Sequence, residues 1–130
     1  LEARGEREQA TRRLACARDA VEGSYRAWVD ACELAPDDLR MHADAARVLV
    51  LYLQRDVAEG ERLLRRAIAL GEEQLPAARA RLAEAAPEQR AALAKELEAL
   101  EIAFGDACET LGVLHLTLKS DPRAARPWFQ

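Results

Sequence analysis

Residues of the kind that build catalytic or metal sites are few in this sequence. It contains three cysteines and two histidines in 130 residues, and no C-x-x-C pair, H-E-x-x-H motif or glycine-rich phosphate loop. His42 and His115 have no Ser, Cys or Asp at a spacing that suggests a catalytic triad. We therefore expect no enzyme activity, no metal and no cofactor. Cys16, Cys32 and Cys108 are predicted to be buried thiols, with one disulfide as the alternative.

Aromatic residues are also scarce, at 5% of the chain, so leucine, valine and alanine must form most of the core. The longest apolar run, 48–53, is far shorter than the roughly 18 residues of a membrane-spanning helix. The net charge of −4 argues against a nucleic-acid partner, because phosphate binding usually needs a basic surface. With 50% hydrophobic and 32% charged residues, the composition is that of one globular domain.

The start of the sequence leaves the cellular compartment open. No secretion signal is visible, and the chain begins at Leu1 rather than at Met. We expect the natural N-terminus to be missing, so that a signal could have been lost with it. The cytoplasm is the favoured compartment.

Helical signals occur along nearly the whole chain. β-branched residues are rare and never alternate with polar ones, which predicts an all-α protein. Asp19 and Asp56 each precede a glutamate three residues later, a capping-box pattern that predicts a helix start. Asp37-Asp38 and Asp121-Pro122 predict two further starts. The predicted helices cover about 2–18, 19–34, 39–54, 56–70 and 87–119, with Gly71 as a C-cap and prolines 36, 76, 87 and 122 dividing the chain.

Two of these helix starts belong to a repeated segment. Asp19-Ala-Val-Glu-Gly23 resembles Asp56-Val-Ala-Glu-Gly60, which lies 37 positions later, and the helix bodies behind them align at 36. A period of this length is typical of stacked helix pairs, which bury their apolar faces only against neighbouring pairs.

The repeat unit resembles the tetratricopeptide repeat family. The family's second helix has a small residue, then a large apolar residue, then alanine, as in Ser24, Trp28 and Ala31 and again in Gly60, Leu64 and Ala67. Pro36 takes the position of the family's closing proline, and Leu111-Gly112, Ala124 and Trp128 match a third unit. Thr11-Arg12 and Arg47-Val48 depart from the family's Leu-Gly pair.

The resemblance implies a short α-solenoid of antiparallel helix hairpins. Its units are expected at about 5–36, 39–72 and 105–130, the last incomplete, with an insertion at about 75–104 that contains much of a long helix. An unrelated helical bundle with similar helix-hairpin patterning is the alternative.

The same resemblance implies a partner-binding wall on the first helices of the units. The expected partner-binding residues are His42, Leu49, Tyr52, Leu53, Val113 and Leu116, with Ala45, Asp106 and Glu109 on the same face. This wall is apolar enough to hold a helix or an extended peptide, so the expected function is a non-catalytic scaffold or adaptor for a protein partner. The alternative is that residues 82–100 cover the wall.

A heptad stripe supplies a second interaction candidate. Its apolar positions, four and three residues apart in turn, are Leu93, Leu97, Leu100, Phe104, Ala107, Leu111, Leu114 and Leu118. The stripe either packs within the chain or pairs with a second copy as a homodimer. A further alternative is a small-ligand-binding component of a bacterial cell-envelope transport system, which would need an enclosed apolar cavity.

Overall fold

Helices form nearly all of the protein in the computed structural model, which describes residues 2–130. No strand occurs within this range, so the prediction of an all-α fold is confirmed. The elements are α1 (Glu2–Leu34), α2 (Leu39–Arg47), the π-helical η1 (Val48–Leu53), α3 (Val57–Glu84), α4 (Pro87–Val113), the π-helical η2 (Leu114–Leu118), α5 (Pro122–Ala125) and the 3₁₀-helical η3 (Arg126–Phe129).

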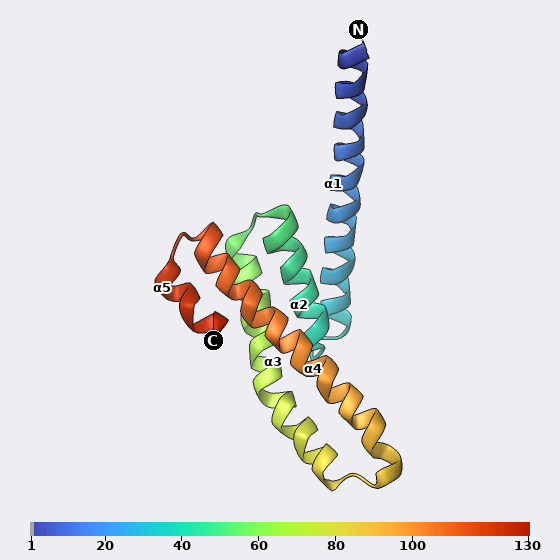
Figure 1. Cartoon of the computed structure of the whole chain (residues 1–130), viewed down its shortest axis with the longest axis vertical. Helices are drawn as coiled ribbons and strands as arrows, with labels where there is room; N and C mark the ends of the chain where they lie inside the picture. The colour runs from blue at the N-terminus through green and yellow to red at the C-terminus, as the bar shows by residue number, and fades with distance from the viewer. Residues whose placement is uncertain (1) are drawn as a thin grey trace.

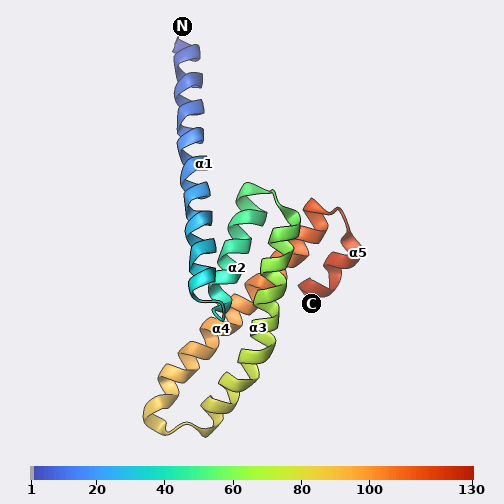
Figure 2. The same cartoon turned by 180° about the vertical axis from the view of Figure 1, so that it is seen from behind.

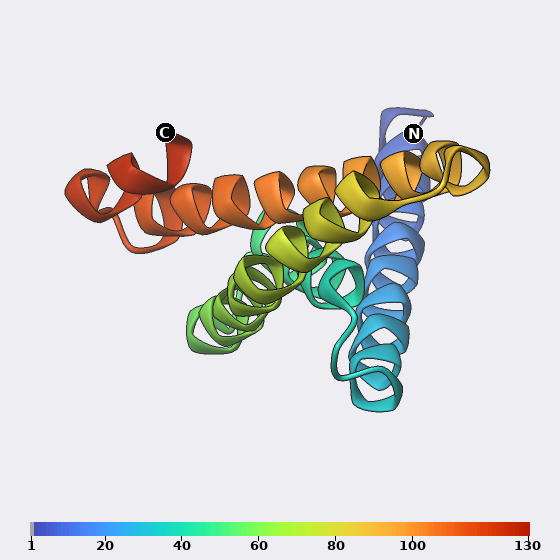
Figure 3. The same ribbon diagram turned by 90° about the horizontal axis from the view of Figure 1, so that it is seen from below.

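Helix α2 lies at the centre of the fold. It packs against α1, α3 and α4, and the view from below shows it between α1 and α3 with α4 lying across them (Figure 3). Helices α3 and α4 form an antiparallel hairpin whose tip projects from the body, and α5 and η3 fold back onto the C-terminal part of α4 (Figures 1 and 2). The core lies where α2, α3 and α4 meet, and its fully buried side chains include Leu49, Leu64, Leu111 and Leu114.

Helix α1 is continuous, so the predicted break at residue 19 is wrong. Its first part extends away from the other helices (Figures 1 and 2), and every residue from 3 to 20 is exposed, including Leu14 at 71%. No proline or turn sequence interrupts this stretch. A capping box marks the start of a new helix only where the chain turns away from the preceding one. The unit expected at 5–36 is therefore a single helix rather than a pair. Cys16 is exposed on this helix, contrary to prediction.

Helix α3 continues through Pro76, where the sequence predicts an end. Leu75 and Ala78 stay buried on the same side of the helix. The free energy gained by burying them therefore exceeds the cost of the backbone hydrogen bond that is lost at the proline. Gly71 is not a C-cap, because it lies inside α3. The Phe104 ring packs closely against it, and a Cβ built at Gly71 would lie 2.1 Å from a ring carbon of Phe104. The insertion expected at about 75–104 is thus the outer half of the α3–α4 hairpin.

Helix α4 and η2 run without a break from Pro87 to Leu118, which confirms the helix predicted at about 87–119. Much of the heptad stripe on this helix is internal, because Ala107, Leu111 and Leu114 are fully buried in the core. Its first members, Leu93 and Leu97, are half-buried. The stripe therefore forms part of the fold of the single chain.

The backbone structure of the segment from α2 to the start of α3 recurs 65 positions later, in the segment formed by the end of α4, η2 and α5. The backbone N–H of Gln54 donates to the Leu49 carbonyl at 2.7 Å, and the N–H of Lys119 donates to the Leu114 carbonyl at 3.0 Å. Asp56 and Asp121 then precede the next helix in each copy. Buried positions match as well, in the pairs His42/Ala107, Ala45/Thr110, Ala46/Leu111, Leu49/Leu114, Val50/His115 and Gly60/Ala125. The two segments thus bury six pairs of equivalent positions.

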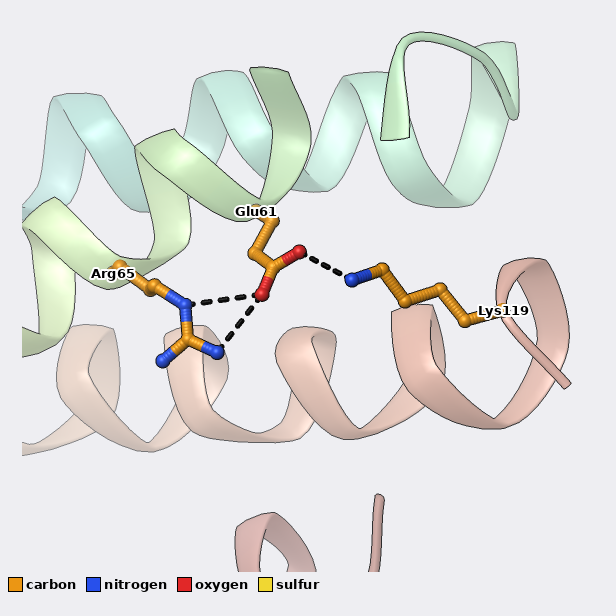
Figure 4. Close-up of polar contacts among 3 residues, drawn as sticks. All are labelled: Glu61, Arg65 and Lys119. Atoms are coloured by element: carbon orange, nitrogen blue, oxygen red, sulfur yellow. Dashed lines mark hydrogen bonds and ion pairs between the residues drawn. The ribbon is translucent and has the colours of Figure 1, made fainter. Parts of the chain in front are cut away.

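An ion-pair network joins the two copies of this segment. One oxygen of Glu61 on α3 accepts hydrogen bonds from Arg65 at 3.0 and 2.8 Å, and the other accepts from Lys119 Nζ at 2.5 Å (Figure 4). Lys119 directly follows η2, so the contact links the second helix of one copy to the turn of the next. Hydrogen bonds from Lys119 and then Arg65 lower the pKa of Glu61 from its ordinary value of 4.5.

We expect this network to contribute stability that is lost at acidic pH. Because the pKa of Glu61 is lower in the folded than in the unfolded protein, its contribution is complete above pH 4.5 and disappears as pH falls through the lowered folded value. Glu61→Gln should therefore flatten the fall in unfolding free energy between about pH 5 and 3, by less than about 1 kcal/mol for a pair at the surface. Urea unfolding at several pH values measures this. Glu73→Gln, at an exposed glutamate of the same helix, is the control that should follow the wild type.

Candidate partner-binding groove

Three hollows follow one another along the side of α4 that faces α2. Their volumes are about 350, 270 and 80 Å³. The first two share Arg40 and Ala103, and the second and third meet at the Arg47–Asp106 ion pair, so they form a row along the seam between α2 and α4. We name it the α2–α4 groove; its lining includes Arg40, Asp44, Arg47 and Leu51 from α2 and η1, and Glu96, Ala99, Ile102, Asp106, Glu109 and Val113 from α4. At about 1.5 Å per residue, the α4 side is roughly 25 Å long.

The α2 side of the groove follows from the amphipathic pattern of that helix. Leu39, Ala43 and Ala46 are buried on one face. The stripe about 100° further around the helix, with positions four, three and four residues apart, is Arg40, Asp44, Arg47 and Leu51. The start of the helix is held by Asp38, whose side chain accepts a hydrogen bond from the backbone N–H of Met41 at 3.0 Å.

Acidic side chains dominate the charge of the groove. Its lining contains six carboxylates, Asp37, Asp38, Asp44, Glu96, Asp106 and Glu109, and two arginines. Arg47 pairs with Asp106 across the groove at 3.4 Å, and Arg40 pairs with Asp44 at 3.6 Å. Burial raises the pKa of Asp44, while Arg40 and Arg47 act in the opposite direction. The groove therefore favours a partner that carries positive charge.

The predicted wall residues fall into two groups. His42 and Leu49 are buried in the core, and the His42 ring nitrogen Nδ1 lies 2.7 Å from the carbonyl oxygen of Asp38. Neither residue offers accessible surface to a partner, because α1, α3 and α4 all pack around α2 and take up its apolar face. Ala45 is buried for the same reason.

The other predicted wall residues lie at or near the surface. Tyr52 and Leu116 are exposed, and Leu53 is half-buried on η1. Val113 is half-buried and lines the groove, as do Asp106 and Glu109. Residues 82–100 do not cover the α2–α4 groove. Ala99 and Leu100 line this groove, and the tip of the α3–α4 hairpin projects away from the body of the protein (Figure 1).

Sequence reasoning missed the residues that line the α2 side of the groove. Arg40, Asp44, Arg47 and Leu51 form a helical stripe that the spacing alone would have revealed, once the apolar stripe was assigned to the core. Ile102 was also missed, because its position lies outside the heptad stripe of the same helix.

No protein-family model, curated protein or solved structure matches this chain. In the part of the chain that the structure describes, no helix is long and apolar enough to cross a membrane. Within residues 2–130, no group of three or more His, Cys, Asp or Glu side chains is placed to hold a metal ion.

Proposed function

We propose that this protein is a non-catalytic scaffold that binds a segment of a partner protein in the α2–α4 groove. The observation that carries this proposal is the row of three adjoining hollows along about 25 Å of α4, which is long enough for several residues of an extended peptide or for a short helix. Grooves between helices of a rigid bundle are common binding sites.

The chemistry of the groove indicates what kind of segment it accepts. Ala99, Ile102 and Val113 supply apolar surface, and carboxylates surround them. A segment with small apolar side chains between lysines or arginines matches both features. Asp44 and Asp106 would bind its cations in place of, or together with, the arginines that they now contact.

We also propose that the architecture is a short helical-repeat stack of the tetratricopeptide type. The support is the repeat at 65 positions, in which α2 with the start of α3 and the end of α4 with α5 bury equivalent residues. The pairs correspond to the units expected at about 39–72 and 105–130. In such a stack the first helices lie side by side, which is where the α2–α4 groove is.

The test compares two substitutions of exposed aliphatic residues by arginine. Ile102→Arg places a bulky cation in the groove, whereas Leu34→Arg makes the same change at the 88%-exposed end of α1, outside the groove. We expect partner capture from a lysate of the source organism to fall by about tenfold or more with Ile102→Arg and to persist with Leu34→Arg. A photo-crosslinking residue at position 102 should label the same partner.

Circular dichroism and the unfolding midpoint show whether both variants remain folded. Equal capture by the two variants, or a crosslink at position 34 but not at 102, would place the partner outside the groove. Capture that is insensitive to salt between about 50 and 500 mM would contradict the acidic character of the contact.

A further inference from the structure

A second apolar surface runs along α4, from the seam between α3 and α4 to the contact of α4 with η3. Two hollows of about 420 and 370 Å³ share Phe104 and Gly105 and so continue one another along α4. Cys108, Trp128 and Phe129 line the second hollow, and Phe129 is 51% exposed. We call this surface, formed by Phe104, Gly105, Cys108, Trp128 and Phe129, the end face.

The repeat at 65 positions shows what covers the corresponding surface in the first copy. The counterparts of Phe104, Cys108, Trp128 and Phe129 are Leu39, Ala43, Leu63 and Leu64, and each of these is at most 1% exposed. Leu39 clusters with Ala103 of α4, and the other three cluster with Ala107 and Leu111 of α4. Helix α4, together with its neighbours, therefore buries this surface in the first copy, whereas in the second copy the same positions remain half-buried or exposed.

The differences between the copies indicate the charge of a covering helix. In the first copy Arg47 pairs with Asp106 of the covering helix, α4. The counterparts of Arg40 and Arg47 are Gly105 and Gly112, while the carboxylate of Asp44 is kept as Glu109. Glu72, Glu101 and Glu109 line the two hollows, and their single cation, Arg79, lies 3.4 Å from Glu101. The two hollows are thus lined by three carboxylates and one arginine, and the arginines of the first copy are absent.

Gly105 also leaves room for a neighbouring side chain. A Cβ built at Gly105 would meet no atom within 4 Å, in contrast to one at Gly112, which would lie 2.6 Å from the Phe129 ring. A helix laid along α4 can therefore approach closely at Gly105.

We propose that the end face binds an amphipathic α-helix of a partner protein, with alanine and leucine toward α4 and lysine or arginine at its flanks. This helix lies along α4 as α4 lies along α2. The site meets the α2–α4 groove at Glu109, which lines both, but Phe104, Cys108 and the two aromatic residues of η3 line the end face alone.

The probe is a synthetic peptide with the sequence of residues 99–118 in which Cys108 is replaced by alanine and Glu101, Asp106 and Glu109 are each replaced by lysine, so that the peptide has no thiol of its own. The same peptide with the three acidic residues retained is its acidic counterpart. Alkylation by N-ethylmaleimide, followed by mass spectrometry, reports whether Cys108 in the whole protein is covered, and the exposed Cys16 serves as the internal control. We expect the basic peptide to slow the alkylation of Cys108 by about tenfold near saturation and to leave Cys16 unchanged. The acidic peptide should have little effect.

Two glycine-to-arginine variants provide the matched control. Gly105→Arg fills the open space and adds a cation, so it should abolish the protection of Cys108 by the basic peptide. Gly5→Arg makes the same change where an added Cβ also meets nothing within 4 Å, far from the end face, and should retain full protection. Both exchanges replace a helical glycine, so neither is expected to destabilise its helix.

Three results would overturn the proposal. Equal protection by both peptides would remove the argument from charge, and no protection by the basic peptide at millimolar concentration would remove the site. If Cys108 becomes protected as the concentration of the protein itself rises, with a dimer mass in sedimentation that Gly105→Arg abolishes, the occupant is a second copy and not a basic helix. Each of these results can be obtained whether or not the α2–α4 groove captures a partner protein, so the two proposals can fail separately.

Discussion

Leu64→Ala is expected to lower the free energy of unfolding by about 3–4 kcal/mol, because it opens a cavity in the centre of the core. Leu64 has no exposed surface and belongs to the cluster that joins α2, α3 and α4. Small alanines such as Ala43, Ala46 and Ala67 belong to the same cluster, and they have no long side chains with which to fill the space. Urea unfolding followed by circular dichroism measures the loss.

The control for this exchange is Leu34→Ala, which removes the same atoms from a side chain that is 88% exposed. We expect a change within about 0.5 kcal/mol there. Losses of similar size at both positions would contradict the packing of α3 between α2 and α4. A loss at Leu64 with an unchanged dependence on urea concentration would indicate that the unfolded state is the same in both variants.

Proline at an exposed position of α3 is expected to cost about 3 kcal/mol or more, since it removes a backbone hydrogen bond and clashes with the preceding turn. Ala69→Pro tests this, because Ala69 is exposed and its side chain contributes little to packing. The segment around it carries Leu64, Ala67, Ile68 and Leu70 into the core, so a kink there displaces them together. The measurement is again the free energy of unfolding.

The matched exchange in α1, Ala10→Pro, is expected to change that free energy by less than about 0.5 kcal/mol. Residues 3–20 are exposed, so melting of this part of α1 removes helix without opening the core. An isolated helix of this length is only marginally stable in water. Hydrogen exchange should show fast amides before residue 20 and slow ones in α2 and α4. A large loss of stability with Ala10→Pro would show instead that the first part of α1 packs on another surface.

The features that were predicted correctly depend on residues close together in the chain. Asp38 and Asp121 cap their helices as expected, accepting hydrogen bonds from Met41 at 3.0 Å and Ala124 at 3.1 Å. The long helix from Pro87 was also predicted to within a residue of its end. Caps and periodicity act within one or two turns, so the sequence reports them directly.

The capping box at Asp56 was wrong in detail for a tertiary reason. Asp56 precedes α3, but its side chain makes no capping hydrogen bond, and its φ of 50° places it in the left-handed region. Glu59 binds Arg62 at 2.8 and 2.6 Å instead of turning back to the helix start. The π-helical end of η1 and the turn that follows it decide how the chain enters α3, and the local pattern contains no sign of either.

The sequence by itself determined that this protein is helical, where most of its helices begin, and that its apolar residues are arranged to stack helices against one another. Only the tertiary structure decided that α1 is one helix, that α3 passes through Pro76, and which face of α2 is open. A helix face is buried or exposed according to how many neighbours pack on it, and three helices pack on α2. For that reason Leu49 lies in the core, while Arg47 and Asp106 meet in the groove.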